Sequence, residues 1–391
     1  MGGNLQNKVS CLWKEPGVQA QFKSAVSLHG HTSHSHESLY FIPSMAGYFP
    51  PLRWLIAQHE KRAKDTRSVT VDFTKGYWTP PLAPLPAFQL ERHQIEAQLN
   101  LPALISLTDH DNIEAPMLLR VVPEARQIPV SLEWSVPCFG TVFHLGIHNL
   151  PSEQATWILH DLNAFTETPG HAQLHELLAA LNRLPEVLIV FNHPLWDLPG
   201  IGQAKHRHAL NAFVTEYGSY LHAFELNGLR SWEENHEVAQ FAKGWNQLVV
   251  AGGDRHGCEP SGVVNLTEAE VFSEFVYQVR KERRSQVLFM PQYNEPLPLR
   301  LALSVLDVLR DYPDYSVGSR RWDERVFHPD QQGEMRRLSE LWSTPPAFIK
   351  WFVRAMHLLE PAPVRRFMRF ALSLPPQEPR LLLREYQEEA L

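Results

Sequence analysis

Seven short runs of β-branched and large apolar residues recur along the chain, and polar residues follow most of them. They are Ser24–Leu28, Ala103–Leu107, Ile128–Leu132, Val142–Ile147, Val187–Phe191, Leu221–Leu226 and Gln247–Ala251. This composition predicts buried strands. Segments with helical spacing of apolar positions separate several runs, at Phe88–Leu99, Ala172–Leu184, Ala204–Tyr217, Glu233–Ala242 and Thr267–Arg284. Strands that alternate with helices favour parallel pairing, so the pattern predicts an α/β barrel rather than a sandwich.

Two regions fall outside this repeat. The segment from Tyr40 to Pro86 is long for a strand-to-helix connection, is dense in Pro, Trp and Tyr, and carries a basic patch at Lys61–Arg67. It is either a functional lid or a passive insertion packed on the barrel. The predicted organisation is an N-terminal extension at 1–23, a barrel at 24–289 with an insertion at about 40–87, and a helical C-terminal appendage at 290–391.

Within the appendage, two predicted helices combine aromatic and basic residues, at Ala347–Leu359 and Val364–Leu374. An interfacial membrane helix has this composition. Such stripes more often bury their apolar face on the protein's own domain, and we favour that interpretation.

Composition and charge narrow the class of protein. Of the 391 residues, 44% are hydrophobic and 20% are charged, as in ordinary soluble globular proteins. The formal charge of −7 argues against broad binding to nucleic acid or to an acidic membrane. A small phosphorylated substrate stays compatible with it, because bound cations would supply local positive charge. The composition does not indicate an oligomeric state.

Cysteine usage and hydropathy bear on localisation. The three cysteines, Cys11, Cys138 and Cys258, lie far apart in no metal-binding or redox spacing, which favours a reducing compartment. The chain contains no apolar core of signal-peptide length and no run of about 18 apolar residues. We therefore expect a cytoplasmic protein without stable membrane insertion.

A potential metal ligand stands at or near the end of nearly every predicted strand. Barrel enzymes build their sites from the C-terminal ends of their strands. Histidines scattered over a surface would not repeatedly follow strands, so we expect these side chains to lie close together in the fold. The candidate metal ligands are His29, His31, His36, His110, Glu133, His144, His193, Asp254 and His256.

The densest part of this set is VSLHGHTSHSHE at Val26–Glu37, with four histidines within eight positions. His29 and His31 are two apart and project from the same side of an extended chain. Taken alone, the stretch is also compatible with a solvated His-rich loop. Imidazoles and carboxylates without thiolates suit zinc, manganese or iron. The candidates exceed the needs of one ion, so we predict two or three divalent ions, an arrangement suited to phosphoester hydrolysis.

Seven short motifs follow one another over roughly residues 24–265. They are HGHT at His29–Thr32, LTDHD at Leu107–Asp111, SLEWS at Ser131–Ser135, FHLG at Phe143–Gly146, FNHP at Phe191–Pro194, FELNG at Phe224–Gly228 and AGGDRHG at Ala251–Gly257. In this order they resemble the PHP family, the polymerase and histidinol phosphatase domain superfamily. The resemblance implies a distorted seven-stranded (β/α) barrel with a two- or three-metal centre.

The resemblance also implies how the ligands divide among the ions. A bridging water or hydroxide would attack phosphorus in line with the departing alcohol. The first ion would be held by His29, His31, Glu133 and Asp254, the second by Glu133, His144 and His193, and the third by His36, His110 and His256.

The chain departs from the family's pattern in two places. The family usually has aspartate where His36 stands, which leaves His34 and His36 as competing ligands, and we prefer His36. Arg255 occupies a place where the family usually has a small residue. Its guanidinium either contacts substrate phosphate or faces outward. Asp109 is expected to orient an imidazole rather than bind metal. The candidate catalytic residues are Glu133, Asp254, Asp109 and Arg255.

Weaker candidates are found in the insertion and beside the motifs. Lys75 would reach a phosphate if the insertion folded over the pocket, with Tyr77 or Trp78 stacking on a ring; it is equally compatible with a solvated lysine. Arg230 is a candidate to line the pocket, and His148 is expected to be structural. The sequence has no distinctive setting for Ser/His/Asp or Cys/His nucleophilic catalysis.

These observations predict a metal-dependent phosphoesterase that hydrolyses a phosphomonoester. One alternative is a phosphodiesterase or nuclease acting on short single-stranded nucleic acid or nucleotides, whose bases would stack on the aromatic insertion. A second alternative is a metal-loaded binding module without catalysis. A related amidohydrolase activity is a more distant possibility.

Overall fold

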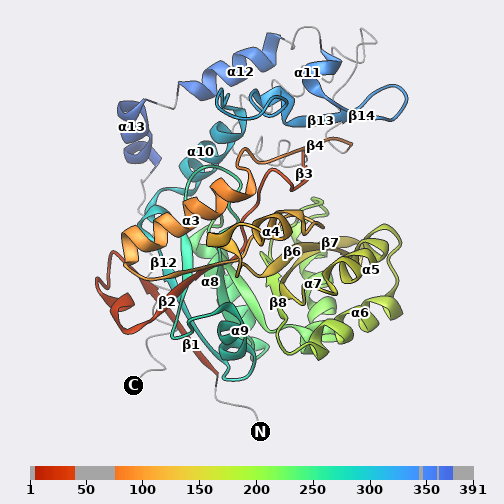
Figure 1. Ribbon diagram of the computed structural model, residues 1–391, viewed down its shortest axis with the longest axis vertical. Coiled ribbons are helices and arrows are strands. Elements are labelled where there is room, and N and C mark those ends of the chain that lie inside the picture. The colour runs from red at the N-terminus through yellow and green to blue at the C-terminus, as the bar shows by residue number, and fades with distance from the viewer. Residues whose placement is uncertain (1–4, 40–74, 343–346, 359–360, 373–391) are drawn as a thin grey trace.

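Figure 1 shows a computed structural model of the chain, which describes residues 5–39, 75–342, 347–358 and 361–372. Two five-stranded sheets form its centre, with helices around them, and a small four-stranded sheet lies near the C-terminal helices. Most of the predicted insertion, 40–74, lies outside the described residues.

The first sheet has the strand order β1 (Gln6–Cys11), β12 (Arg284–Phe289), β11 (Val263–Thr267), β2 (Ser24–Ser27) and β5 (Ala103–Ile105). β1 pairs with β12 and β2 with β5 in parallel, whereas β11 is antiparallel to both of its neighbours. The residues expected to form an N-terminal extension thus supply an edge strand. The helix predicted at Thr267–Arg284 is shorter, α9 (Phe272–Arg280), because buried strands occupy both of its flanks.

The second sheet has the order β10 (Leu248–Gly252), β9 (Ala223–Asn227), β8 (Leu188–Asn192), β7 (Thr141–Leu150) and β6 (Val130–Cys138). β8, β9 and β10 run parallel and are buried along their whole length, as is usual for strands covered on both faces. β6, β7 and β8 are antiparallel neighbours. Phe139 and Gly140 join β6 to β7 with φ values of 51° and 75°, as a tight two-residue hairpin requires.

The described strands form three separate sheets, and none of them closes into the expected seven-stranded barrel. The prediction of parallel pairing throughout was wrong because the β6–β7 hairpin and β11 interrupt the strand–helix repeat. The two large sheets adjoin through isolated parallel bridges, which pair Gly30 with Arg255 and His110 with Glu133. The result is a mixed α/β fold in which strand ends from both sheets meet.

Helices surround the sheets, and in Figure 1 α5, α6 and α7 lie beside β6, β7 and β8. Ser231 caps α8 by accepting a hydrogen bond from the Glu234 amide, and Asn100 ends α3 in the left-handed conformation. The largest buried cluster includes Trp134 and Phe191. The helices are α3 (Pro84–Leu99), α4 (Glu114–Leu119), α5 (Ala155–Glu167), α6 (His171–Arg183), α7 (Gln203–Tyr217) and α8 (Trp232–Gly244). Short 3₁₀ turns lie at Val18–Gln21, Pro123–Ala125, Gly218–Tyr220, Pro291–Asn294 and Trp322–Glu324.

The third sheet joins the end of the insertion to the C-terminal region. Its antiparallel strands are β14 (Met335–Arg337), β13 (Val326–Pro329), β4 (Tyr77–Trp78) and β3 (Glu37–Ser38). The C-terminal helices are α10 (Leu297–Leu309), α11 (Leu338–Leu341), α12 (Ala347–His357) and α13 (Ala362–Leu372). Both α12 and α13 contact α10. The sequence therefore located these last two helices to within a few residues.

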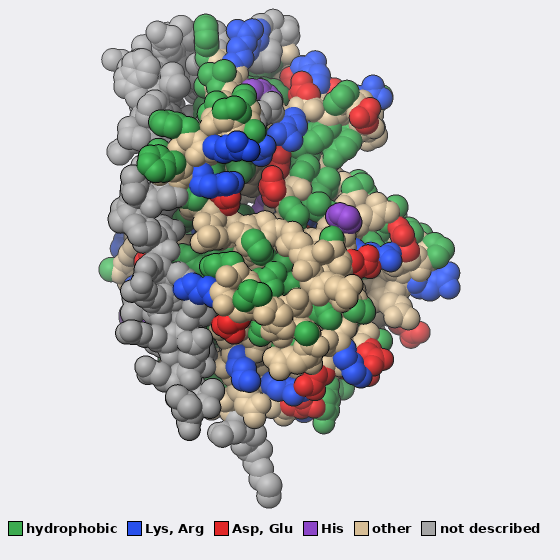
Figure 2. All heavy atoms as spheres, turned by 90° about the vertical axis from the view of Figure 1, so that its left-hand side faces the viewer, with side chains coloured by type: hydrophobic (Ala, Val, Ile, Leu, Met, Phe, Trp, Pro, Cys, Tyr) green, Lys and Arg blue, Asp and Glu red, His purple; other side chains and the backbone are tan. Residues whose placement is uncertain are grey.

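The apolar faces of α12 and α13 are not fully covered by the described residues. Trp351, Phe367 and Phe370 have 68%, 68% and 69% of their surface exposed. Figure 2 shows basic and hydrophobic side chains together over the upper part of one face of the molecule, at the height of these helices in Figure 1. None of the described helices is both long enough and apolar enough to cross a membrane.

Candidate metal centre

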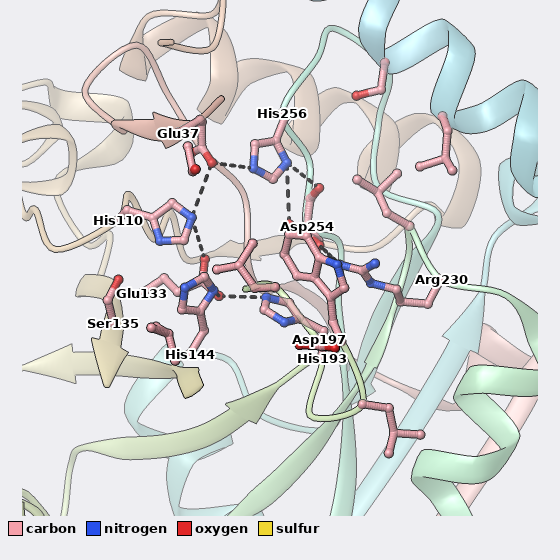
Figure 3. A pocket seen from close by; sticks show the side chains of 18 of the residues that line it. Glu37, His110, Glu133, Ser135, His144, His193, Asp197, Arg230, Asp254 and His256 are labelled. Carbon is pink, nitrogen blue, oxygen red and sulfur yellow. Dashed lines mark hydrogen bonds and ion pairs between the residues drawn. The ribbon is translucent and has the colours of Figure 1, made fainter. Parts of the chain in front are cut away.

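A pocket of about 510 Å³ opens where side chains from β3, β6 and β7 meet the turns that follow β8 and β10. Figure 3 shows imidazoles and carboxylates pointing toward one another inside it, including Glu37, His110, Glu133, His193 and His256. These residues come from both large sheets and from the small sheet. The predicted convergence at strand ends is therefore present.

Glu133 lies at the centre of the cluster and has only 1% of its surface exposed. Burial opposes ionisation of its carboxyl group, but the surrounding imidazoles hold its pKa well below the ordinary value. Five imidazole nitrogens lie 3.0–3.4 Å from its two oxygens, on His29, His31, His110, His144 and His193.

Asp254 faces the same group from the end of β10. Its Oδ1 lies 3.6 Å from Nε2 of His29 and 3.7 Å from Nε2 of His31. His29, His193 and Asp254 all have positive φ, at 62°, 26° and 50°. Each follows a strand directly or within two residues, and left-handed backbone at non-glycine residues is concentrated at functional sites. These turns direct the side chains into the pocket.

Glu37, rather than His36, belongs to the donor set. Glu37 Oε2 lies 3.0 Å from His256 Nε2 and 3.3 Å from His110 Nε2, and Oε1 accepts a hydrogen bond of 2.5 Å from Ser35. Pairing of β3 with β4 turns Glu37 inward. The neighbouring His36 lines the pocket, but its ring stacks on Tyr77 at a centroid distance of 4.1 Å. Alternation along an extended strand explains the difference.

The donor atoms form four overlapping groups. Two of the groups share Glu133, and His29, His31 and His110 each belong to two groups. Within each group the donor atoms all lie within 4.8 Å of one another. The groups are His29, His31 and Glu133; His110, Glu133 and His144; His29, His193 and Glu225; and His31, Glu37, His110 and His256. The groups agree with the implied ligand sets in part: His29, His31 and Glu133 stand together, and so do His110 and His256, with Glu37 in place of His36. His193 groups with His29 and Glu225 rather than with Glu133 and His144, and Asp254 belongs to none of the four groups.

Hydrogen bonds on the outer nitrogens orient several of the rings. Nδ1 of His29 lies 2.5 Å from Glu225 Oε1, and Nδ1 of His256 lies 2.9 Å from the Asp254 carbonyl oxygen. Nε2 of each ring then faces the carboxylates of the cluster. Burial disfavours the charged form of His29, but Glu133, Glu225 and Asp254 raise its pKa well above the ordinary value. Partners of this kind on the outer nitrogen are usual for imidazoles that bind metals.

Two ring nitrogens show that the set fits a cation. Nε2 of His31 and Nδ1 of His144 are buried and make no hydrogen bond with any described residue, although a Glu133 oxygen lies 3.4 Å from each. Buried polar atoms normally have a partner. A lone pair on each nitrogen, directed toward shared carboxylates, is the arrangement that divalent metal binding requires. The nitrogen and oxygen donors suit a divalent metal ion.

Sequence reasoning missed Glu225 and the asparagines that support the carboxylates. Glu225 Oε2 accepts hydrogen bonds of 2.8 Å from the His193 amide and from the Asn227 side chain. Asn227 also donates to Asp254, at 3.1 Å, and Asn192 donates to Glu133, at 2.9 Å. Glu225 lies within buried β9 as Glu133 lies within buried β6. An acidic residue inside an apolar strand, here in the FELNG motif, was the feature from which Glu225 could have been predicted.

Asp109 does not orient an imidazole directly, which corrects the sequence-based expectation. Its carboxylate is fully buried and accepts hydrogen bonds from the Thr32 amide, at 2.6 Å, and from the Thr32 hydroxyl, at 2.7 Å. Burial raises its pKa to about 6, against the lowering effect of these two bonds. Asp109 therefore holds the turn that follows His31, and it acts on the donors through the backbone.

Arg255 neither lines the main pocket nor faces outward. It has 4% of its surface exposed, and its Nε donates to Glu91 at 2.6 Å while Nη1 donates to the Gly257 carbonyl at 2.9 Å. This ion pair links α3 to the turn after β10. Arg255 is therefore a structural residue, because its donors are already directed away from the main pocket. These contacts give no support to the predicted catalytic role, which stays a prediction.

Arg230 lines the pocket where Arg255 does not. Its guanidinium lies 4.1 Å from the centroid of the Trp196 ring, and Nη2 lies 3.9 Å from Asp254 Oδ2. Stacking on an aromatic face is a favourable setting for a guanidinium.

The remaining weaker candidates lie as follows. Nδ1 of His34, the competitor of His36, lies 2.8 Å from Glu114 and outside the donor groups. His148 is buried with its Nδ1 2.8 Å from the Ser106 hydroxyl, as a structural histidine would be. Lys75 is exposed and does not line the pocket, whereas Trp78 does.

Comparisons with known proteins add little to this geometry. No protein-family model and no curated protein sequence matches the chain. Among solved structures, an amidohydrolase from Chromobacterium violaceum with bound sulfate and no metal has a TM-score of 0.31 and 15% identity, covering 46% of this chain and 84% of its own. A protein from Bifidobacterium adolescentis described as a metal-dependent phosphoesterase has a TM-score of 0.30 and 13% identity, covering 51% and 91%. Because these TM-scores are low, the function has to be inferred from the side chains of this protein itself.

Proposed function

We propose that the protein is a metal-dependent phosphoesterase of the PHP type that hydrolyses a phosphomonoester with water. One observation supports this above all: a single buried carboxylate, Glu133, is shared by two groups of imidazole donors at 3.0–3.4 Å. Donor groups that share a carboxylate hold ions close together, and closely spaced ions suit attack on phosphorus. The chemical class of the ions is zinc, manganese or iron, two or three per chain.

Bound divalent ions would lower the pKa of a water molecule and stabilise charge on the phosphoryl oxygens. The residues of the chain do the rest. Glu225 and the Asp254 carbonyl oxygen hold the rings of His29 and His256 in position, so their donors are arranged before substrate enters. Arg230 is the one arginine or lysine among the described residues that line the pocket, and we assign its guanidinium to the phosphate.

The pocket disfavours a long polynucleotide as substrate. Its described lining contains five carboxylates, Glu37, Asp111, Glu133, Asp197 and Glu234, in addition to Asp254, against one arginine. A nucleic-acid channel is normally lined by several basic side chains. We therefore retain a small phosphorylated substrate as part of the proposal. A cytoplasmic location is also part of it.

The test combines metal analysis with a substrate panel on the same purified sample. Elemental analysis gives the ions per chain, and the panel compares phosphomonoesters with a short oligonucleotide, a cyclic nucleotide and amides. We expect monoester hydrolysis that a chelator abolishes and added metal restores. His193→Ala and Asp254→Ala should lose bound metal and at least about a hundredfold in rate.

Glu153→Gln is a suitable control, because Glu153 is exposed and does not line the pocket. It should keep full metal content and full rate. A metal-loaded protein that is inert on every phosphoester would reject the proposal and favour a binding module. Preference for the oligonucleotide or for the amides would redirect it to those reactions.

A further inference from the structure

One wall of the pocket is an apolar stripe that comes from outside the predicted barrel. Leu297, Leu301 and Val305 lie four residues apart on α10, and all three line the pocket and are only partly buried. Residues with this spacing share one face of a helix. Leu299 and Leu306, on other faces of α10, are buried in the protein. The stripe is thus left available to a ligand.

Further apolar side chains extend this surface from the second sheet. Leu195, Trp196 and Leu198 follow β8, and Leu229 follows β9. In Figure 3 the pale blue helix at the upper right lies across the pocket from Glu133 and His144, and Arg230 lies at the right, below this helix. The pocket therefore has a donor-rich side, where the phosphate would bind, and an apolar side across from it.

This asymmetry restricts what the leaving alcohol can be. Hydroxyl groups of a sugar or nucleoside that lay against Leu297, Leu301 and Val305 would lose water without gaining hydrogen bonds from these three side chains, although Ser304 on the same helix also lines the pocket. An additional anionic group would meet the carboxylates of the lining. An aliphatic or aromatic group would instead bury apolar surface on both partners, which is favourable. A volume of about 510 Å³ is in the range of small-molecule pockets.

We propose that the pocket selects phosphomonoesters whose alcohol carries an apolar aliphatic or aromatic group, and that this group lies against the α10 stripe of Leu297, Leu301 and Val305. The proposal rests on the proposed phosphoesterase function and names its substrate class. It makes these three residues determinants of specificity rather than of catalysis, since they contribute no donor atom.

The chain length of straight-chain alkyl phosphates tests this directly. Ethyl, butyl, hexyl and octyl phosphate have leaving alcohols of similar basicity, so differences in rate report on contacts with the chain. In the metal-loaded protein, kcat/KM should rise by roughly three- to fourfold for each methylene that is fully buried, and level off when the pocket is full. Glycerol phosphate and ribose phosphate should react no faster than ethyl phosphate. A flat or falling series would overturn the proposal.

Matched variants on α10 show whether the stripe is responsible. Leu301→Gln and Val305→Asn should flatten the series, because they should lower kcat/KM for octyl phosphate much more than for ethyl phosphate. Leu303→Gln is the control, because Leu303 lies on the same helix but lines a neighbouring cavity of about 220 Å³ and not the main pocket. It should keep the wild-type series. Thermal melts of all three variants verify folding, and an unchanged series in both stripe variants would reject the assignment of these residues.

Binding of alkylphosphonates, which the enzyme cannot hydrolyse, separates this proposal from the proposed function. Calorimetry on the metal-loaded protein should show affinity that rises with chain length and loses that dependence in Leu301→Gln. If no phosphate ester is hydrolysed but this binding series appears, the catalytic proposal fails and the apolar site stands. If phosphonates bind without dependence on chain length, or do not bind, the apolar site is rejected.

Discussion

The Glu225 carboxylate lies 2.5 Å from Nδ1 of His29, on the side of the ring opposite Glu133, which is 3.0 Å from Nε2. Both carboxylates are almost fully buried. Glu225 therefore fixes the ring and its tautomer without being close to the substrate side of the pocket. Its contribution should be visible in metal affinity before it is visible in substrate binding.

Removal of the Glu225 carboxylate should weaken metal binding. We expect Glu225→Ala to reduce affinity for the ion nearest His29 by about 10- to 100-fold, and Glu225→Gln to reduce it less, because the amide oxygen still accepts from Nδ1. Competition with a chromogenic chelator measures the affinity. Wild-type affinity in Glu225→Ala would show that His29 is oriented by other contacts.

Gly252 offers a second way to displace the same carboxylate. A Cβ at this position would overlap with Glu225 Oε1, so alanine cannot be accommodated unless Glu225 moves. Gly252→Ala should therefore reproduce the metal-binding defect of Glu225→Ala and lower the melting temperature as well. Gly244→Ala is the control, since nothing lies within 4 Å of a Cβ there. Equal chelator titrations for Gly252→Ala and wild type would contradict this coupling.

Substitutions of Glu37 and of His36 should have very different effects on metal content, although the two residues are adjacent. Glu37→Gln removes a charged oxygen that lies 3.0 Å from His256 and 3.3 Å from His110, so elemental analysis should show the loss of one ion per chain. His36→Asn should keep the ion content, because His36 stacks on Tyr77 instead. The reverse result would restore His36 as the ligand.

The buried pair of Glu91 and Arg255 should determine stability rather than substrate affinity. Glu91→Ala leaves a buried guanidinium without its carboxylate, which typically costs about 3–5 kcal/mol of unfolding free energy. Urea denaturation measures this loss. The KM of the folded fraction should be unchanged; a large rise in KM with unaltered stability would return Arg255 to the substrate site.

Burial of His222 should make the protein less stable in acid, independently of the metal centre. Burial, followed by the charges of Arg280, Lys281 and Arg283, lowers its pKa to about 3. Its Nδ1 accepts from the Ile189 amide at 2.8 Å, so the ring is neutral in the native state. The unfolded chain, with a histidine pKa of about 6.5, binds more protons at lower pH. Stability therefore falls as pH decreases from about 6.5 toward 3, by up to about 1.4 kcal/mol per pH unit.

His222→Asn removes this titration while its side-chain oxygen can still accept from the Ile189 amide. Urea denaturation between pH 7.5 and 4.5 should show a shallower loss of stability in the variant than in wild type. Titrating groups common to both proteins cancel in the difference. Parallel curves for the two proteins would contradict the assignment.

The sequence predicted the position of the centre more reliably than the connections between strands. The donors stand at or just after buried apolar runs, and this regular placement can be seen in the sequence alone. Strand direction is not: VSLEWSVPC and TVFHLGIHNL are apolar and β-branched whichever way they pair, and only the Phe139–Gly140 turn makes them a hairpin. The expectation of parallel strands failed at that turn and at β11.

Side-chain direction over one or two residues was likewise beyond sequence reasoning. The choice between His36 and Glu37 depends on a two-residue strand that pairs with Trp78, far along the chain. Arg255 appeared available for phosphate because its partner, Glu91, lies on a helix that no motif marks. Contacts between segments distant in sequence decided both cases.

Because α10 lines the pocket, it determines which fragments of the protein would keep the pocket complete. A fragment that ends at Phe289 would retain every donor assigned to the ions, yet it would leave the cavity open on one flank. Such a fragment should still take up metal while hydrolysing esters with little discrimination. Exchanging the C-terminal region between related proteins should then transfer the preference for a substrate without changing the metal-binding residues.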